Sequence, residues 1–155
     1  MLIEVFNERY NKEVRYVATH LRHDDFDEVY AVNGESPHIS ILEDWEGSAR
    51  RWIIFNKKCE PVAILGVRPL IAFSDIACPW LLGTDGLNEM KKFFVKISKP
   101  IIAEMMKGYK LLVNYVDARN VKSVRWLKWC GFDVEDPEPF GALNIPFHKY
   151  TMESV

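Results

Sequence analysis

The chain is poor in cysteine, and the pattern of the few that it has excludes two common architectures. Its three cysteines, Cys59, Cys78 and Cys130, are odd in number and widely spaced, without a CxxC pair. A disulfide framework uses an even set, and a structural zinc site uses paired thiols or a Cys–His cluster. The four histidines show no ligand spacing either. We therefore expect no metal site and a reducing, cytoplasmic setting.

The chain also lacks an excess of positive charge and any long apolar run. Its 20 Lys and Arg residues face 22 Asp and Glu residues, which gives a net charge of −2. Phosphate backbones attract basic surfaces, so we expect no nucleic-acid partner. No segment approaches the roughly 18 apolar residues that a membrane span needs. The N-terminal segment MLIEVFNERYNKEV has early charges and no long apolar run, so we do not expect it to be a signal peptide.

What the chain does have is enough apolar residues for a packed core. Hydrophobic residues make up 48% of its 155 positions, which argues against disorder. No repeat, low-complexity tract or linker divides it. The sequence therefore predicts one domain over residues 1–155.

Hydrophobic periodicity predicts helices and strands in a mixed order. A helical pattern runs from Val14 through Val29, and Ser40 with Glu43 forms a capping box for a second helix. A third, long helix carries an apolar stripe from Leu87 to Met105, where Pro100 predicts a kink or a break. A short fourth helix covers about 121–130. The predicted strands are LIEVF, RWIIF, PVAILGV, IACPWLLG, GYKLLVNYV and FHKYTM.

Proline inside one of these strands is informative. Pro79 interrupts IACPWLLG, and proline cannot donate to a sheet ladder. We therefore expect this strand to lie at an edge or to bend at Pro79. The runs RWIIF and PVAILGV, joined by NKKCE, predict a β-hairpin. Consecutive strands flanked by helices indicate an α+β or mixed α/β domain around one sheet.

This order resembles that of the GNAT acetyltransferases, where a long helix follows the fourth strand and a short Asn-headed helix follows the fifth. The segment NVKSVRWLKWCGF (120–132) is similar to the Asn-x-x-Ala/Ser … Gly-Phe segment of those enzymes. The resemblance covers nearly the whole chain. It implies a GNAT-like fold, with one central, mostly antiparallel sheet of six to seven strands and about four flanking helices.

Four motifs resemble a phage and prophage family with a GNAT-like fold, which includes the internal virion protein A of T7-type phages. In chain order they are LRHDDFDEV, WLLGTDGL, YVDARNVKSVRWLKWCGF and PFHKYTM. This resemblance implies a bacteriophage or prophage origin. It also implies a location in the host cytoplasm or in the virion.

The GNAT resemblance further implies an acetyl-CoA site between the fourth and fifth strands. The pantetheine would pair with backbone near the fourth strand, and the pyrophosphate would sit on the GTDG turn. The cofactor-binding residues implied in this way are Trp80, Leu81, Leu82, Gly83, Thr84, Asp85, Gly86, Asn120 and Ser123.

Some of these residues also fit a purely structural role. The GTDG turn lacks the Arg/Gln-x-x-Gly-x-Gly/Ala pattern of GNAT enzymes, and Asp85 is an anion where an anion should bind. Thr84 or Asp85 would then simply cap the next helix, and Asn120 would cap the helix that it precedes. Trp129 lies among cations on the outer face of that helix. It is either a cation–π stack or partner surface, or it is half covered by the C-terminal tail.

Catalytic groups are the least defined feature. The tyrosine that GNAT enzymes place in the last helix aligns with Leu127, so Tyr115 and Asp75 are the remaining candidates for an acid and a base. Each also fits a structural role, as a core aromatic and as a turn residue. Arg22, Asp25 and Glu28 recur every three residues on one helix face, where the resemblance places the acceptor; a solvated charged face is the alternative.

The resemblance leaves two functions open. The first is an N-acetyltransferase of phage or prophage origin, which transfers acetyl from acetyl-CoA to an unknown amine. The second is a catalytically inactive GNAT-fold protein that acts in virion assembly or binds a phage or host protein. Leu127 and the altered GTDG turn favour the second function, whereas the Asn-headed helix and Pro79 favour the first.

Overall fold

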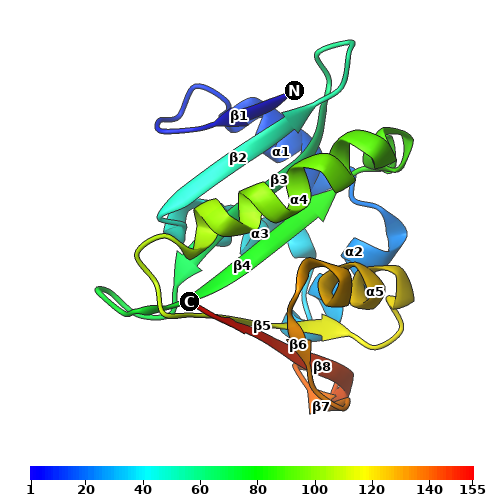
Figure 1. Ribbon diagram of the computed structural model, residues 1–155. Coiled ribbons are helices and arrows are strands. Elements are labelled where there is room, and N and C mark those ends of the chain that lie inside the picture. Colours follow the sequence, from blue (N-terminus) through cyan, green and yellow to red (C-terminus); the bar gives the residue numbers. More distant parts are fainter.

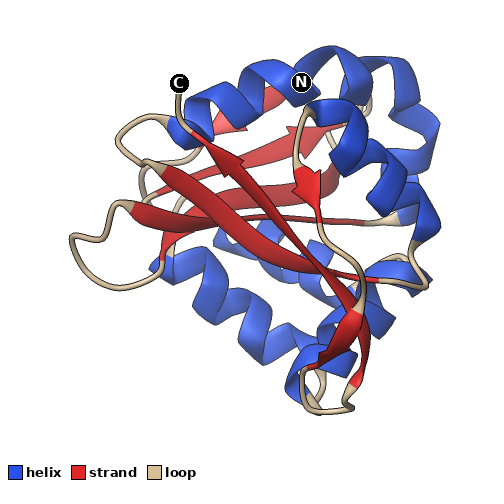
Figure 2. Cartoon of the chain, turned by 60° about the horizontal axis from the view of Figure 1, so that its bottom comes forward, coloured by secondary structure: helices blue, strands red, loops and turns tan.

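A single eight-stranded sheet runs through the computed structural model, which describes all 155 residues, and helices cover both faces of the sheet (Figures 1 and 2). The strand order is β1-β2-β3-β4-β5-β8-β6, with β7 paired to β8. The strands are β1 (Leu2–Glu4), β2 (Arg50–Phe55), β3 (Pro61–Pro69), β4 (Ile76–Gly83), β5 (Leu111–Asp117), β6 (Asp133–Val134), β7 (Glu138–Phe140) and β8 (Ile145–Glu153). The helices are α1 (Asn11–Thr19), α2 (His23–Asn33), α3 (Pro37–Gly47), α4 (Lys91–Met106) and α5 (Val121–Cys130).

Alternating side chains divide the interior into two cores, one on each face of the sheet. On one face, Val14 and Val17 of α1 and Trp45 of α3 pack against strand residues such as Ile53 and Ile64. On the other face, α4 and α5 pack against the neighbouring strand positions; the residues involved include Trp52, Ile54, Leu65, Ile101, Ile102, Met105 and Leu127. The period of two in a strand sends Trp52 and Ile53 to opposite cores.

The predicted hairpin and the predicted central strands are confirmed, but the first predicted helix is two helices. The chain leaves α1 after Thr19 and starts α2 at His23. Arg22 adopts an extended backbone (φ −55°, ψ 150°), and its N–H donates to the carbonyl of Gly83 at 2.9 Å. A tertiary hydrogen bond to β4 therefore overrides the helical periodicity.

The predicted Ser40 cap is also wrong, and of the two outcomes expected at Pro100 the break does not occur. Helix α3 begins at Pro37, preceded by Ser36, rather than at a Ser40 cap, because proline suits the first helical position. Helix α4 continues through Pro100 without dividing. The irregular part lies earlier, where Asp85–Met90 form a 3-10 segment (η1) that precedes α4. The sheet exceeds the expected six to seven strands because the tail adds the short strands β6 and β7.

No helix of the chain is both long and apolar enough to cross a bilayer.

Candidate functional site

The sheet opens between β4 and β5. These two strands are parallel, and they pair only at Ile76 with Leu111 and Ala77 with Leu112. Beyond Ala77 they diverge, as the green and yellow strands of Figure 1 show, although β4 stays paired with β3 as far as Gly83. We call this gap the split. The next residue of β4 whose backbone faces β5 is Pro79, which has no N–H with which to extend the ladder.

Side chains bridge the inner end of the split. The amide nitrogen of Asn114 on β5 donates to the carbonyl oxygen of Pro79 at 2.8 Å. The amide oxygen of Asn114 accepts from the N–H of Tyr115, also at 2.8 Å. The hydroxyl of Tyr150 on β8 lies 3.5 Å from the same Pro79 carbonyl. Asn114 thus replaces the missing ladder bond and keeps the strands apart.

A cleft of about 310 Å³ occupies the outer part of the split and connects the two faces of the sheet. On one face it is lined by Arg22, which directly precedes α2, by Asp25 and Glu28 of α2, and by Tyr115 of β5. On the other face its lining comes from β4, η1, α4, α5 and β8: Leu81, Leu87, Asn88, Lys91, Phe94, Val95, Lys122, Ser123, Trp126, Leu127 and Tyr150. Its size falls in the range of small-molecule sites. It also lies at the carboxyl ends of two parallel strands, where open α/β sheets bind ligands.

Strand alternation gives the cleft one backbone donor. The Pro79 carbonyl and the Gly83 N–H both point away from β3, so the N–H and C=O of Leu81, midway between them, do the same. No strand pairs with β4 on that side at Leu81. The Leu81 N–H therefore faces the split. Trp80 and Leu82 direct their backbone groups to β3 instead.

Glu28 is the carboxyl group most clearly placed for chemistry in this cleft. It is half-buried, and it accepts a 2.7 Å hydrogen bond from the backbone N–H of Asp117. Burial raises the pKa of the Glu28 carboxyl to about 8, and the charges of Asp25 and Asp117 add to this effect, although the Asp117 N–H opposes it. A carboxyl with a pKa near neutrality, in a cleft, is a candidate general base.

Asp25 has a structural partner in the fold. It is 3% exposed, and its carboxylate accepts from the Gly83 N–H at 2.8 Å and pairs with Arg22 at 2.8 Å. Burial raises the pKa of Asp25, whereas Arg22 and the Gly83 N–H lower it. Arg22 also reaches the side chain of Asn88 at 3.2 Å. The first turn of α2 thus binds both backbone groups of Gly83 and fixes the end of β4.

Tyr150 is a functional candidate that the sequence did not reveal. Its ring is 7% exposed and packs edge-on against Phe132 at 5.1 Å, and it lines the cleft. Burial raises the pKa of Tyr150, and the nearby Glu28 raises it further. Its hydroxyl is therefore a proton donor rather than a base. The sequence offered no signal for it, because β8 joins β5 from the far end of the chain.

The remaining predicted cofactor residues are divided among several places. The indole N–H of Trp80 donates to Ser48 on the opposite face of the sheet at 2.8 Å. Asn120 is buried and caps α5 through the Ser123 N–H at 3.4 Å. Thr84 caps η1 by accepting from the Gly86 N–H at 3.2 Å. The capping interpretations of Thr84 and Asn120 are thus confirmed, and only Leu81 and Ser123 line the cleft.

The GTDG turn lies at a separate groove and not in the cleft. Thr84, Asp85 and Gly86 line a wide groove of about 1460 Å³ between the end of α1, the β2–β3 loop and the start of α4. The groove shares Asn88 and Lys91 with the cleft, which places these two residues at the cleft mouth. Lys122 lines the opposite wall. Neither lysine takes part in an ion pair.

The two catalytic candidates from the sequence lie far apart. Tyr115 lines the cleft, and its ring stacks on Phe140 with centroids 3.9 Å apart. Asp75 precedes β4 at the closed end of the split and pairs with Lys110 at 3.5 Å, so the structure does not bring it to the cleft. Trp129 is 48% exposed, and the ammonium of Lys99 lies 4.6 Å from its ring centroid. The contact is the cation–π stack of one sequence interpretation, but its cation comes from α4 and not from the cations of α5 beside Trp129.

Comparison with solved structures identifies this architecture. A spermidine N-acetyltransferase from Vibrio cholerae, solved with CoA and spermine, matches 98% of this chain and 95% of its own, with a TM-score of 0.71 and 12% identity. The fold is that of the GNAT acetyltransferases. A protein from Acinetobacter baylyi named as an acetyltransferase matches 99% of this chain and 92% of its own (TM-score 0.74, 12% identity). A GNAT-family protein from Chromobacterium violaceum covers 98% and 86% (TM-score 0.65, 13% identity).

No protein-family model matches the sequence, and no curated protein matches it. These comparisons support the GNAT part of the sequence resemblance and give no support to the phage family.

Proposed function

We propose that the protein is an N-acetyltransferase that uses acetyl-CoA to acetylate a cationic amine. The observation that carries the proposal is the cleft itself, which crosses the sheet through the split and brings an unpaired backbone N–H, a carboxyl group of raised pKa and a buried phenol to one space. The likeness to a spermidine N-acetyltransferase of the same fold supports it.

The residues of the cleft fit acetyl-CoA in part. The apolar walls formed by Leu81, Phe94 and Trp126 suit a pantetheine arm, and Lys91 and Lys122 offer positive charge to phosphates at the mouth. The GTDG turn fits less well, because Asp25 already occupies the Gly83 N–H. We propose that the phosphates are bound by the lysines rather than by that turn, and that Asn120 supports Ser123 as the cap of α5.

Acetyl-CoA supplies an acetyl group activated as a thioester. The Leu81 N–H polarises the carbonyl that the amine attacks, as a fixed dipole aimed at developing negative charge. The reacting amine loses its ammonium proton to solvent before it attacks, and Glu28, once ionised, takes the second proton that it loses as its bond to carbon forms. Tyr150 donates its proton to the sulfur as the carbon–sulfur bond breaks. Tyr115 forms the wall on the acceptor side.

The acceptor side of the cleft is rich in carboxyl groups, which favours a positively charged acceptor. Glu28 becomes anionic when it ionises, whereas Asp25 is already paired with Arg22. Tyr115 separates the cleft from a second space of about 430 Å³, whose walls hold Glu135, Asp136 and Glu138 against one cation, Lys149. A polyamine could place one amine at Glu28 and a second near these acids. We therefore propose polyamines as the first acceptors to test.

The test follows the release of the CoA thiol from acetyl-CoA with a thiol-reactive dye. The amine panel contains spermidine, spermine and a lysine-containing peptide. We expect amine-dependent release that Glu28→Gln lowers at least about a hundredfold. Equal rates with and without every amine would contradict the proposal.

A second function, a catalytically inactive GNAT-fold protein of phage or prophage origin that binds a protein partner, rests on other observations. Leu127 stands where the resemblance expects a tyrosine, and the carboxylate of Asp25 already accepts the Gly83 N–H, which a cofactor would otherwise use. The β3–β4 loop also exposes apolar side chains, with Leu70 57%, Ile71 71% and Phe73 fully exposed. Under this second proposal that loop contacts the partner, and Phe73→Ser would weaken the complex.

A further inference from the structure

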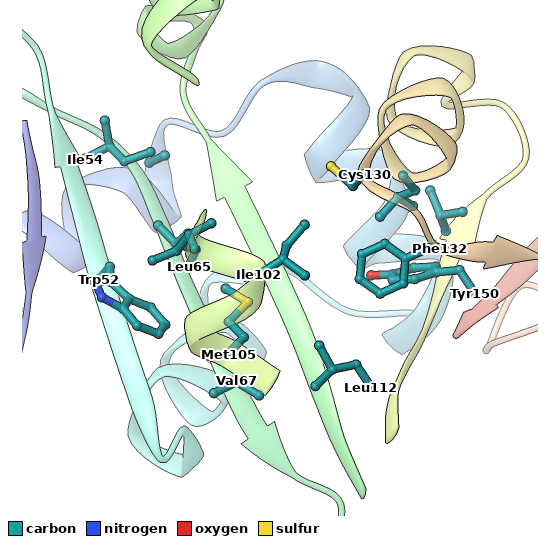
Figure 3. Packing of buried hydrophobic residues seen from close by; sticks show 14 of the residues in the cluster. Trp52, Ile54, Leu65, Val67, Ile102, Met105, Leu112, Cys130, Phe132 and Tyr150 are labelled. Atoms are coloured by element: carbon teal, nitrogen blue, oxygen red, sulfur yellow. The ribbon is translucent and has the colours of Figure 1, made fainter. Parts of the chain in front are cut away.

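A second, apolar space adjoins the cleft. It has a volume of about 40 Å³, and ten of its eleven lining residues are hydrophobic. Leu65 of β3, Ile101, Ile102 and Met105 of α4, and Phe132 form its inner walls. Figure 3 shows Leu65, Ile102 and Met105 on one side and Phe132 with Tyr150 on the other. We call this space the recess.

The recess is continuous with the cleft. Leu81, Trp126, Leu127 and Tyr150 line both spaces. The Leu81 N–H and the Tyr150 hydroxyl, which are the groups proposed to meet the reacting carbonyl and the sulfur, therefore stand at the junction. Any group attached to that carbonyl has two directions available, towards α2 and the acceptor or into the recess.

We propose that the recess binds the alkyl part of the acyl group, so that the protein accepts acyl donors longer than acetyl. This inference rests on the proposed function of the cleft. One water-sized sphere needs about 10–15 Å³ of such space, so 40 Å³ holds about three such spheres. Because a methyl group is larger than a water molecule, this room corresponds to a propionyl chain and at most to a butyryl chain. The walls carry no charged group that would have to be desolvated.

The side chains at the inner end set the limit on length. Ile102 is 5% exposed and Met105 is 4% exposed, and both belong to the packed core beneath α4. A hexanoyl chain would have to displace them, which a close-packed interior resists. We therefore expect the recess to bind propionyl and butyryl chains better than either acetyl or hexanoyl.

Calorimetric titration tests the recess without an acceptor. The probes are CoA, acetyl-CoA, propionyl-CoA, butyryl-CoA and hexanoyl-CoA. Burying one CH₂ is worth about 0.8 kcal/mol, so we expect Kd to fall by up to about fourfold for each carbon added from acetyl to butyryl, and to rise again for hexanoyl. Ile102→Phe fills the recess and should abolish this preference while the Kd of CoA itself stays within about twofold.

Two further variants keep the test decisive. Met105→Phe fills the recess from another position if Ile102→Phe fails to fold. Val67→Leu enlarges a side chain of the same core outside the recess, and it should keep the preference. If CoA binds but all acyl chains bind within about twofold of one another, the recess proposal is wrong and the proposed cofactor remains. If no CoA compound binds, both proposals are wrong.

Discussion

The side-chain amide of Asn114 donates a 2.8 Å hydrogen bond to the Pro79 carbonyl across the gap between two parallel strands. Pro79 has no N–H to donate to β5, and the side chain of Asn114 on β5 donates to the Pro79 carbonyl instead. Together they mark the inner end of the split, beyond which the cleft opens.

Removing this bridge should cost stability. Asn114→Ala leaves the Pro79 carbonyl and the Tyr115 N–H without the Asn114 side chain, and each bond lost from a half-buried site costs about 1 kcal/mol. We expect the free energy of unfolding to fall by about 1–2 kcal/mol in urea denaturation. Asn88→Ala is the control, because its side chain meets only Arg22 near the surface. Equal small losses in both variants would contradict the role of the bridge.

The raised pKa of Glu28 predicts how stability depends on pH. An unfolded glutamate titrates near 4.3, whereas folded Glu28 titrates at about 8. Between these values the folded chain holds a proton that the unfolded chain has lost, so stability falls as pH rises through this window. We expect the wild type to lose stability relative to Glu28→Gln between pH 5 and 8. If the melting temperatures of the two proteins changed equally with pH over this range, the pKa of Glu28 would not be raised.

The same carboxyl group predicts the pH dependence of activity. A base with a pKa of about 8 accepts a proton only when ionised, so kcat should rise with pH and level off above about pH 8. Glu28→Gln should lower kcat and remove this limb of the profile. If kcat of Glu28→Gln still rises towards pH 8, another group is responsible for the rise.

Tyr150 should affect the chemical step but not the binding of CoA. Tyr150→Phe removes only a hydroxyl whose contact with Pro79 is long, so the fold should be retained. Loss of a general acid lowers the rate by about a hundredfold or more, and we expect this drop with the best amine of the panel. The Kd of CoA should change by less than about twofold. An unchanged kcat would exclude Tyr150 as the acid.

Truncation of Trp129 tests whether its ring is a surface contact or part of the core. Its ring is about half exposed under Lys99, and an exposed cation–π pair is worth about 0.5–1 kcal/mol. Trp129→Ala should therefore lower the free energy of unfolding by about 1 kcal/mol. A loss of about 3 kcal/mol or more, which is typical of buried tryptophan, would place it in the core.

The sequence predicted the features that depend on local patterns. The hairpin, the strand that contains Pro79 and the apolar stripe of α4 follow from residue spacing and backbone chemistry, and each is confirmed. The break between α1 and α2 could not be predicted, because Arg22 leaves the helix to bind Gly83, 61 positions later in the chain.

The candidate site was predictable only where one element supplied it. Arg22, Asp25 and Glu28 were proposed from their spacing, and all three line the cleft, although Arg22 precedes α2 and does not share a helix face with the other two. Asn114 and Tyr150 were missed, because their roles depend on the pairing of β5 with β8 and on a carbonyl of β4. The spacing of Asp75 along the chain gave no sign that it lies at the closed end of the split.

The most direct test of the account is whether the split binds acetyl-CoA. Ser123 lines the cleft from the first turn of α5, whereas Val121, two residues earlier, is 53% exposed and lies outside the cleft lining. Calorimetric titration should give a Kd in the micromolar range for the wild type and for Val121→Trp. In Ser123→Trp the bulky ring should weaken binding at least tenfold. Absence of heat with the wild type at millimolar acetyl-CoA, or unchanged binding in Ser123→Trp, would contradict a cofactor site in the split.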